Sequence, residues 1–281
     1  MANILDGLTL SKEIRAQLKE RVDVLRARGI VPRLDVLVAA TDPASLSYVR
    51  MKRKWAETAG MEGESWEIND QTTQAELIDK IGELNANPLV HGILLQHPLP
   101  KHLDENAALM ALGADKDVDG ITPQSLGRLV ADLEGFRCAT PAGAIKLLER
   151  YEIPLVGKRA VVIGRSVIVG KPMALMLLQK HCTVTIAHSR TQNLADLCRE
   201  ADVLVAAVGK AELVKGDWIK PGAVVIDAGY NKVEGRKGDV GDVEFETAKE
   251  VASWITPVPG GVGPMTVATL LSNAVDAAER I

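Results

Sequence analysis

The chain has 281 residues, of which 47% are hydrophobic and 25% charged, so it is long enough for two globular domains and is unlike a disordered chain. Its net charge of −4 disfavours a protein that binds nucleic acid or an anionic membrane, because both partners require a broad basic surface. The first residues lack a basic segment followed by an apolar one, and no run of about 18 apolar residues occurs, so we expect a soluble protein without a secretion signal or a membrane span.

The cysteine and histidine residues give no sign of a disulfide framework or a metal site. Three cysteines lie far apart and form no C-x-x-C pair, which fits a reducing compartment such as the cytoplasm: Cys138, Cys182 and Cys198. Three histidines match no common spacing of metal ligands, and polar loop positions are the simpler interpretation: His91, His97 and His102. We therefore expect no bound metal.

Short β-branched segments alternate with amphipathic segments of helical length in the first half of the chain, which is the pattern of parallel β-α-β units. The predicted strands are residues 34–39, 64–68 and 92–95. Residues 43–60 predict a helix with a proline near its start and a glycine at its end, and residues 73–85 predict another.

The second half repeats this alternation at a spacing of about 20 residues, as in a nucleotide-binding half-fold. A hinge is predicted at residues 136–141. The predicted strands that follow are residues 160–163, 183–187, 203–208 and 224–228, and residues 266–280 predict a final helix. The predicted fold class is therefore α/β with two domains.

The turn that starts at Gly164 joins a predicted strand to a predicted helix, so backbone N–H groups at the helix start can bind a phosphate. It lacks the G-x-G-x-x-G pattern, but Arg165 and Ser166 supply a guanidinium and a hydroxyl suited to phosphate oxygens. The next strand leads to Ser189 and Arg190, where an NAD site usually carries an acidic residue for the ribose 2′-hydroxyl. These residues favour NADP over NAD; the alternative is an ordinary tight turn with solvated charges.

The helix predicted at residues 43–60 carries a candidate acid or base. Tyr48, Lys52, Trp55 and Ala59 recur at helical spacing and share one face. Desolvation on a partly apolar face can lower the pKa of a lysine, which suits acid–base chemistry at neutral pH. The alternative is a solvated basic face, formed by Arg50, Lys52, Arg53 and Lys54.

Three further segments carry weaker signals. Gln96 follows a predicted strand, in the position where open α/β sheets bind ligands. Asp119 belongs to an acidic segment that could equally be a surface turn closed by Gly120. The Pro- and Gly-rich residues 256–266 would allow backbone to approach a ligand closely, or could be a linker.

Five motifs occur in order along nearly the whole chain. They are Y-x-x-x-K at residues 48–52, Q-x-P-L-P at 96–100, K-D-V-D-G at 116–120, G-R-S-x-x-V-G-x-P at 164–172 and T-P-V-P-G-G-V-G-P-M-T at 256–266. Together they resemble the bifunctional methylenetetrahydrofolate dehydrogenase/methenyltetrahydrofolate cyclohydrolase family.

The resemblance implies a folate-binding catalytic domain of residues 1–138 with the C-terminal helix 264–281, a Rossmann-like parallel-sheet NADP-binding domain of residues 139–263, and an active-site cleft between them. It implies NADP-dependent oxidation of 5,10-methylenetetrahydrofolate to the 5,10-methenyl form, followed by hydrolysis to 10-formyltetrahydrofolate. It further implies a homodimer that takes part in one-carbon metabolism and purine biosynthesis.

The resemblance also implies roles for individual residues. Lys52 would be the acid or base of the hydrolytic step, held by Gln96, while Asp119 would bind the pterin and Tyr48 would align the reacting rings by stacking. Further substrate-binding positions would be Pro259, Gly260, Gly261 and Gly263. The cofactor-binding positions would be Gly164, Arg165, Ser166, Ser189, Arg190 and Tyr230.

The chain departs from the family pattern at several positions. The family usually has Leu at His97, His at Thr122, P-C-T-P at residues 138–141 and Ile at Tyr230. Two rival functions are an NAD(P)-dependent dehydrogenase of a small polar acid, as in shikimate-type enzymes, and a folate- or nucleotide-binding protein without catalysis. The Gln96 motif and the loop at 259–264 disfavour the first rival, and the presence of Lys52 disfavours the second.

Overall fold

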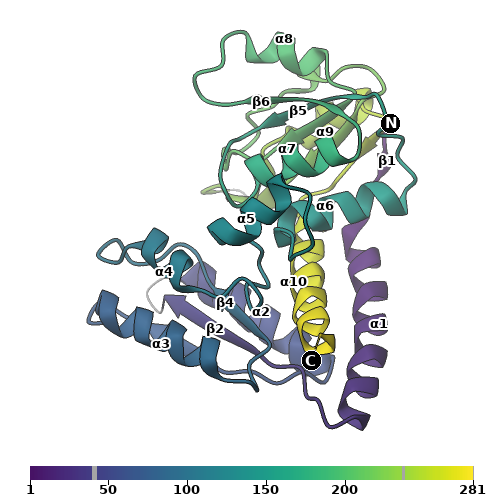
Figure 1. The fold of residues 1–281 in the computed structure, drawn as a ribbon. Coiled ribbons are helices and arrows are strands. Elements are labelled where there is room, and N and C mark those ends of the chain that lie inside the picture. The colour runs from purple at the N-terminus through teal and green to yellow at the C-terminus, as the bar shows by residue number, and fades with distance from the viewer. Residues whose placement is uncertain (40–42, 236–237, 281) are drawn as a thin grey trace. The chain divides into compact units, whose positions relative to one another are not determined.

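The computed structural model describes residues 1–39, 43–235 and 238–280, and of residues 43–48 the backbone alone. The described chain divides into two compact units, shown in Figure 1. Unit 1 comprises Met1–Ser11 and Cys138–Thr269, and unit 2 comprises Lys12–Arg137 and Leu270–Ile281. Two long helices, α1 (Gly7–Ala27) and α10 (Val262–Glu279), contribute residues to both units.

Unit 2 is built around a parallel three-stranded sheet in the order β3-β2-β4. Its strands are β2 (Leu34–Ala39), β3 (Ser65–Ile68) and β4 (Gly92–Leu95). Every residue of β2 and β4 is buried, as expected for parallel strands that are covered on both faces. The helices are α2 (Pro43–Thr58), which packs on β2, α3 (Gln74–Ala86), α4 (Glu105–Ala111), which packs on α3, and α5 (Pro123–Val130).

Polar side chains define where the helices of unit 2 begin. Thr73 and Glu76 form a capping box at the start of α3, so that two backbone N–H groups gain acceptors. The side chain of Asp104 accepts a hydrogen bond from Ala107 N at the start of α4. Thr122 caps α5, whose first residue is a proline. These caps fix the loops that lead from the strands into the helices.

Unit 1 contains a parallel six-stranded sheet in the order β1-β11-β8-β7-β5-β6. Its strands are β1 (Asn3–Ile4), β5 (Arg159–Ile163), β6 (Thr183–Ala187), β7 (Val203–Ala206), β8 (Val224–Asp227) and β11 (Trp254–Ile255). Its helices are α6 (Ala139–Arg150), α7 (Gly170–Gln179), α8 (Leu194–Arg199), the 3₁₀ turn η1 (Gly216–Trp218) and α9 (Phe245–Val251), and β9 (Asn231–Lys232) pairs with β10 (Asp239–Val240) in an antiparallel ribbon. None of the helices in the described part of the chain is long and apolar enough to cross a membrane.

The structure confirms the predicted fold class of two α/β parts, one with a Rossmann-like parallel sheet. The predicted domain ranges, 1–138 with 264–281 and 139–263, differ from the units at residues 1–11, at residue 138 and at residues 264–269. Residues 1–11 belong to unit 1 because β1 pairs with β11. Residues 264–269 also group with unit 1, where the backbone of Met265 lies close to Gly143.

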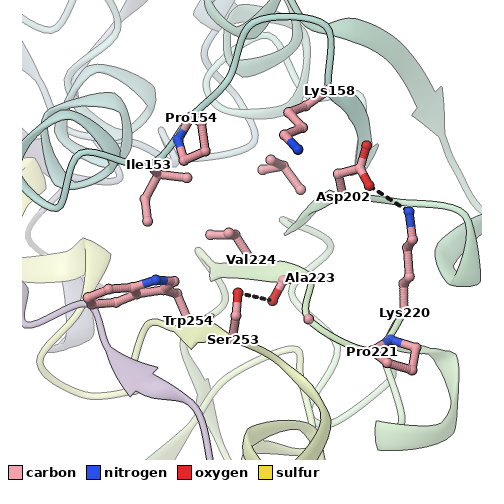
Figure 2. Close-up of a pocket in the computed structure, with 12 residues that line it drawn as sticks. Ile153, Pro154, Lys158, Asp202, Lys220, Pro221, Ala223, Val224, Ser253 and Trp254 are labelled. Carbon is pink, nitrogen blue, oxygen red and sulfur yellow. Dashed lines mark hydrogen bonds and ion pairs between the residues drawn. The ribbon is translucent and has the colours of Figure 1, made fainter.

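A cavity of about 190 Å³ lies at the amino ends of the strands of unit 1, where β7, β8 and β11 begin. Figure 2 shows Lys220 paired with Asp202, with 2.6 Å between Nζ and Oδ1, on one side of this cavity. The turn at Gly164 follows the carboxyl end of β5. The cavity and the predicted phosphate site therefore lie at opposite ends of the strands of this sheet.

Candidate active site

The buried face of α2 presents a lysine. Val49, Lys52, Ala56 and Ala59 recur at helical spacing and are all buried, and Lys52 is 7% exposed. Its basic neighbours Arg50, Arg53 and Lys54 are exposed, so they form the solvated face while Lys52 does not. The buried face therefore differs from the predicted one at Trp55. This side chain lies at the edge of the buried face, with the Arg15 guanidinium 3.8 Å from its ring centroid. The side chain of Tyr48 lies outside the described part of the chain.

Gln96 holds the Lys52 ammonium. It follows β4 directly, and its backbone N–H donates to Leu37 O on β2 over 2.8 Å. Its side-chain amide donates to His97 O at 3.0 Å, which turns the amide oxygen towards Lys52. Lys52 Nζ donates to that oxygen at 2.9 Å. The lysine is therefore fixed by an acceptor that carries no charge.

The segment from Lys116 to Gly120 runs beside β4, with Asp117 opposite Ile93. Asp119 follows in the turn from Asp117 to Gly120, where Gly120 N donates to Asp117 O at 3.0 Å, and the charge of Asp119 acts on the Lys52 ammonium. The side chains of Lys52, Gln96 and Asp119, predicted from three separate motifs, therefore belong to one place in unit 2.

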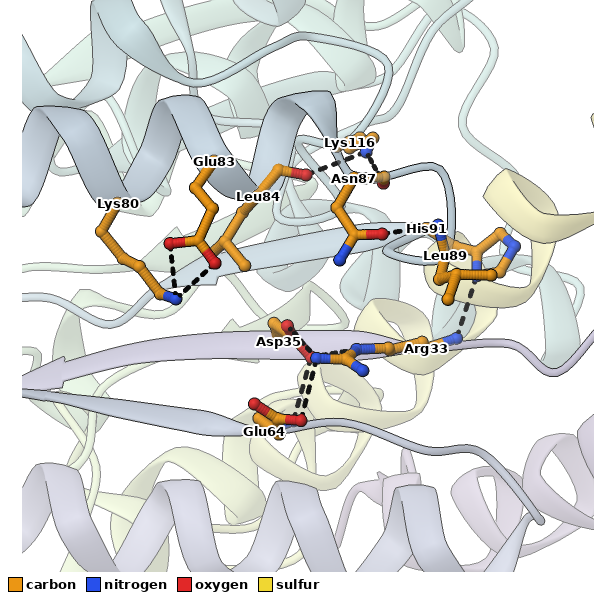
Figure 3. Close-up of polar contacts among 10 residues, drawn as sticks. All are labelled: Arg33, Asp35, Glu64, Lys80, Glu83, Leu84, Asn87, Leu89, His91 and Lys116. Atoms are coloured by element: carbon orange, nitrogen blue, oxygen red, sulfur yellow. Dashed lines mark hydrogen bonds and ion pairs between the residues drawn. The ribbon is translucent and has the colours of Figure 1, made fainter.

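The neighbours of Asp119 in this segment are occupied in holding the backbone. Lys116 Nζ donates to the carbonyls of Leu84 and Asn87 at the end of α3, at 2.9 Å and 2.6 Å, as Figure 3 shows. The Asp117 carboxylate accepts backbone N–H groups from Gly120, Ile121 and Thr122. By contrast, the Asp119 carboxylate accepts no hydrogen bond from the described residues, which leaves it available to a ligand.

Further polar contacts fix the base of the same sheet. Figure 3 shows Arg33 bridging Asp35 and Glu64, with Nη2 at 2.9 Å from Asp35 Oδ2 and 3.2 Å from Glu64 Oε1. Asp35 also accepts the backbone N–H of Glu64 at 2.9 Å. These contacts tie β2 to the start of β3, so they stabilise the strands that position the site.

The electrostatics of the Lys52 and Asp119 pair are governed by burial. Burial lowers the pKa of the Lys52 ammonium from its ordinary value, and the nearby Asp119 carboxylate opposes this shift. Burial raises the pKa of Asp119; Lys52 and His97 oppose the shift, while Asp117 adds to it. The pKa values of both groups are thereby shifted towards neutral pH, where a side chain can gain and lose protons during catalysis.

The turn after β5 has the geometry of a phosphate site. Gly164 has a φ of +125°, and a Cβ there would lie 2.2 Å from the carbonyl oxygen of Ala207. The Ser166 hydroxyl oxygen accepts the backbone N–H groups of Val169 and Gly170 at 3.1 Å and 3.3 Å, at the start of α7. The Arg165 and Ser166 side chains are exposed. Backbone approaches closely at this turn, but Ser166 already accepts the N–H groups at the start of α7, so the exposed Arg165 and Ser166 side chains are the groups that the turn offers to a dinucleotide phosphate.

The other predicted cofactor-binding residues follow neighbouring strands, at the same carboxyl ends of the unit 1 sheet. Ser189 and Arg190 are exposed and lie after β6, whose last residue pairs with the last residue of β5. Tyr230 follows β8, is 45% exposed and donates its hydroxyl hydrogen to Asp239. Because the strands are parallel, these side chains gather at one sheet edge with the Gly164 turn.

Two buried aspartates, which the sequence patterns did not single out, hold the loops at this edge. Asp227 accepts the backbone N–H groups of Gly229, Asp242 and Val243, each at 2.9 Å. Asp242 accepts those of Val208, Gly209 and Lys210 at 2.6–3.0 Å. A Cβ on Gly241 would lie 1.8 Å from Asp227 Oδ2, so the approach requires glycine. The sequence signal was an aspartate within two residues of a glycine in both segments.

The loop from Pro259 to Gly263 follows β11 in unit 1. Gly260 has a φ of +113° and its carbonyl oxygen accepts the N–H of Leu8 at 2.8 Å. Gly261 N donates to Pro257 O at 2.8 Å, and a Cβ there would lie 2.7 Å from the same oxygen. The loop is thus a compact turn that needs glycine at positions 260 and 261, whereas a Cβ on Gly263 would meet no atom within 4 Å. The structure brings these residues into unit 1, whereas Lys52, Gln96 and Asp119 are in unit 2.

No group of three or more His, Cys, Asp or Glu side chains is arranged to hold a metal ion, as far as the described ranges extend.

Comparisons with known proteins decide the family. The model of the tetrahydrofolate dehydrogenase/cyclohydrolase catalytic domain matches residues 5–119, and that of the NAD(P)-binding domain of the same family matches residues 138–281. The chain belongs to the tetrahydrofolate dehydrogenase/cyclohydrolase family. It is 54% identical over 279 residues to the bifunctional protein FolD of Moorella thermoacetica, covering 99% of both chains.

Solved structures of this family share the fold of the whole chain. The bifunctional FolD enzyme of Campylobacter jejuni superposes with a TM-score of 0.97 at 44% identity, covering 100% of this chain and 99% of that one. The Trypanosoma brucei FolD structure, complexed with NADP cofactor and an inhibitor, has a TM-score of 0.94 at 38% identity. The match covers 99% of this chain and 98% of that one. The resemblance stated from the five motifs is thereby confirmed, and the chain is a bifunctional folate dehydrogenase/cyclohydrolase. The shikimate-type and non-catalytic alternatives are set aside.

Proposed function

We infer that the chain oxidises 5,10-methylenetetrahydrofolate to the methenyl form with NADP and then hydrolyses that product to 10-formyltetrahydrofolate. The observation that carries this conclusion is the buried contact of 2.9 Å between Lys52 Nζ and Gln96 Oε1, near the Asp119 carboxylate, in a chain of this family. The NADP cofactor supplies the hydride acceptor when it is bound.

Lys52 is the acid or base of the hydrolytic step. Water adds to a cationic amidinium carbon in this step, so protons must leave the water and reach a ring nitrogen. Because burial lowers the pKa of Lys52, more of its free amine is present near neutral pH than for an exposed lysine. Gln96 fixes the direction of the Nζ atom through its amide oxygen, which accepts a hydrogen bond from the amine and from the ammonium alike.

Asp119 binds the pterin. The adjacent N–H groups of a pterin match the two oxygens of a carboxylate, and the Asp119 carboxylate makes no hydrogen bond that the folate would have to displace within the described residues. Because Lys116 and Asp117 fix the backbone on its N-terminal side, the carboxylate is presented from a rigid turn. Such preorganisation favours alignment of the folate for hydride transfer.

The edge of the unit 1 sheet binds the cofactor. Its pyrophosphate lies at the Gly164 turn, where the exposed Ser166 hydroxyl can donate a hydrogen bond to a phosphate oxygen. Arg165, Ser189 and Arg190 bind the 2′-phosphate that distinguishes NADP from NAD, because hydroxyl and guanidinium groups donate hydrogen bonds to phosphate oxygens. Tyr230 contacts the cofactor at the same ends of the strands. The backbone of residues 259–263 contacts the folate.

Replacement of Lys52 by methionine tests the proposed chemistry. We expect Lys52→Met to lower the rate of methenyltetrahydrofolate hydrolysis by about 100-fold or more, since general acid–base catalysis contributes at least that factor. Folate binding, measured by calorimetry, should persist. The control is Lys54→Met, on the exposed face of the same helix. Unchanged hydrolysis in the Lys52 variant would contradict the assigned role, and a wild-type enzyme that forms no NADPH would contradict the dehydrogenase function.

We further propose that the enzyme is a cytoplasmic homodimer whose product serves purine biosynthesis. Support comes from the resemblance to the family and from the three cysteines, which are buried and form no disulfide, as suits a reducing compartment.

A further inference from the structure

The cavity of about 190 Å³ at the amino ends of the unit 1 strands is lined mainly by apolar side chains. Ile153, which follows α6, and Val224, the first residue of β8, are 9% and 8% exposed, and both line it. Figure 2 shows Ile153 and Pro154 on one side of the cavity and the Trp254 ring on the other. Every lining residue belongs to unit 1, so the cavity is complete within one unit.

The aromatic wall of the cavity is held rigidly. Trp254 is in β11, and its backbone is paired with Asn3 on one side and with Val224 on the other. Its ring packs on the ring of Tyr151, with 5.2 Å between the two centroids. The Tyr151 hydroxyl oxygen in turn accepts the backbone N–H of Asp6 at 3.1 Å. A planar ligand would therefore meet a surface that is already formed, and little ordering would oppose its binding.

The charged groups at the cavity leave one positive charge uncompensated. Asp202 uses both of its carboxylate oxygens, because Oδ1 accepts from Lys220 Nζ at 2.6 Å and Oδ2 accepts the backbone N–H of Arg159 at 2.9 Å. The Lys158 side chain extends towards the cavity in Figure 2. Its ammonium acts on Asp202 through its charge alone, without donating a hydrogen bond to any described residue. Lys158 therefore has three N–H donors to offer to an anionic ligand.

The size and the lining of the cavity define the class of ligand. A dry cavity of about 150 Å³ holds a benzene molecule, so this cavity accommodates one aromatic ring with a small substituent. Contact with the Trp254 ring favours an aromatic body, and the Lys158 ammonium favours a carboxylate on that body. Inorganic phosphate would pair with the lysine, but it would leave the apolar walls in contact with water.

We propose that this cavity is a second ligand site, which binds a small aromatic monocarboxylate with its ring against Trp254 and its carboxylate paired with Lys158. The Gly164 turn follows the opposite ends of the same strands, and Lys52 belongs to unit 2. The ligand therefore binds together with the cofactor and the folate, and does not compete with either of them.

The test is a fluorine NMR titration of the full chain with 4-fluorobenzoate. We expect saturable binding with a dissociation constant of about 1 mM or lower, as suits a ligand of this size. Saturating NADP and tetrahydrofolate should leave this constant unchanged, and inorganic phosphate should not displace the probe. The alcohol 4-fluorobenzyl alcohol keeps the ring and lacks the charge, so it should bind at least about tenfold more weakly, because a charged hydrogen bond is lost.

Two variants test the two halves of the site. Lys158→Met should weaken the binding of 4-fluorobenzoate by about tenfold and leave that of 4-fluorobenzyl alcohol unchanged, because only the charge is removed. Trp254→Leu should weaken the binding of both probes by about threefold or more, because the aromatic contact is lost. Lys12→Met, at an exposed position of α1, is the control and should bind both probes as the wild type does.

Several results would overturn the proposal. They are equal affinity of Lys158→Met and wild type for 4-fluorobenzoate, no binding at about ten times the expected constant, and displacement of the probe by NADP or tetrahydrofolate. Equal binding of the alcohol, or displacement by phosphate, would refute the assignment of an aromatic carboxylate. If Trp254→Leu does not fold, Lys158→Met decides, because Lys158 is partly exposed and its replacement leaves the apolar wall intact.

Discussion

Raising the pH is expected to destabilise unit 1 through one buried carboxylate. Asp227, at the end of β8, is 3% exposed, and burial raises its pKa from 3.8 to about 7 against three backbone hydrogen bonds, while Asp242 adds to the shift. The folded chain therefore binds a proton that the unfolded chain has released between these pH values. Stability is fully present below the unfolded pKa and is lost as the pH rises through the folded pKa.

The size of this effect follows from the shift. A difference of about three pKa units corresponds to about 4 kcal/mol in all, of which about 2.5 kcal/mol is lost between pH 5 and pH 8. The assay is urea unfolding followed by tryptophan fluorescence at several pH values. Asp227→Asn does not titrate, so its unfolding free energy should fall by about 2.5 kcal/mol less than that of the wild type over this range.

A matched control separates this carboxylate from the general effect of pH. The pKa of Asp202 is lowered, mainly by its hydrogen bond from Lys220, so this group is ionised in folded and unfolded chains throughout the range. Asp202→Asn should therefore keep the wild-type slope. If Asp227→Asn also keeps that slope, the reasoning is refuted, and the three backbone N–H donors to Asp227 outweigh the cost of burying its charge.

The remaining predictions concern the cofactor and the assembly. Arg165→Ala and Arg190→Ala should each lower the ratio of kcat/KM with NADP to kcat/KM with NAD by about tenfold, because each removes a charged hydrogen bond. Arg199→Ala is the control, since the Arg199 guanidinium pairs with Asp196 and its loss should leave this ratio unchanged. Equal ratios in all variants would contradict a 2′-phosphate site at these arginines. Light scattering should give twice the chain mass of 30.1 kDa, and a single chain mass would contradict the homodimer.

The strands could be predicted well because burial on both faces leaves long apolar segments in the sequence. All seven predicted strands are present, and β2, β4 and β6 have the predicted bounds. The two-residue strands β1 and β11 were not predicted. They pair across a separation of about 250 residues, and nothing in so short a segment distinguishes it from a loop.

The sequence predicted which residue types form the site, but it did not show which of two similar residues is buried or which one binds the backbone. Lys52 appeared as one of several basic residues, and its burial depends on how α2 packs. Asp117 and Asp119 look equivalent in the sequence, yet the first accepts three backbone hydrogen bonds and the second none from the described residues. Local spacing does not reveal which carboxylate faces the backbone, because that depends on how the following turn folds.

The short strand β1 has a practical consequence for dividing the chain. Asn3 and Ile4 cover the edge of β11, with Asn3 N donating to Ser253 O at 2.8 Å and Leu5 N donating to Ile255 O at 2.9 Å. A fragment that starts at Cys138 would lack this strand and would expose the backbone of β11, and unpaired edges promote association between molecules. A permuted fragment in which residues 1–11 are linked to residues 138–269 would keep β1 paired with β11. Unit 1 is therefore better isolated by permutation than by truncation.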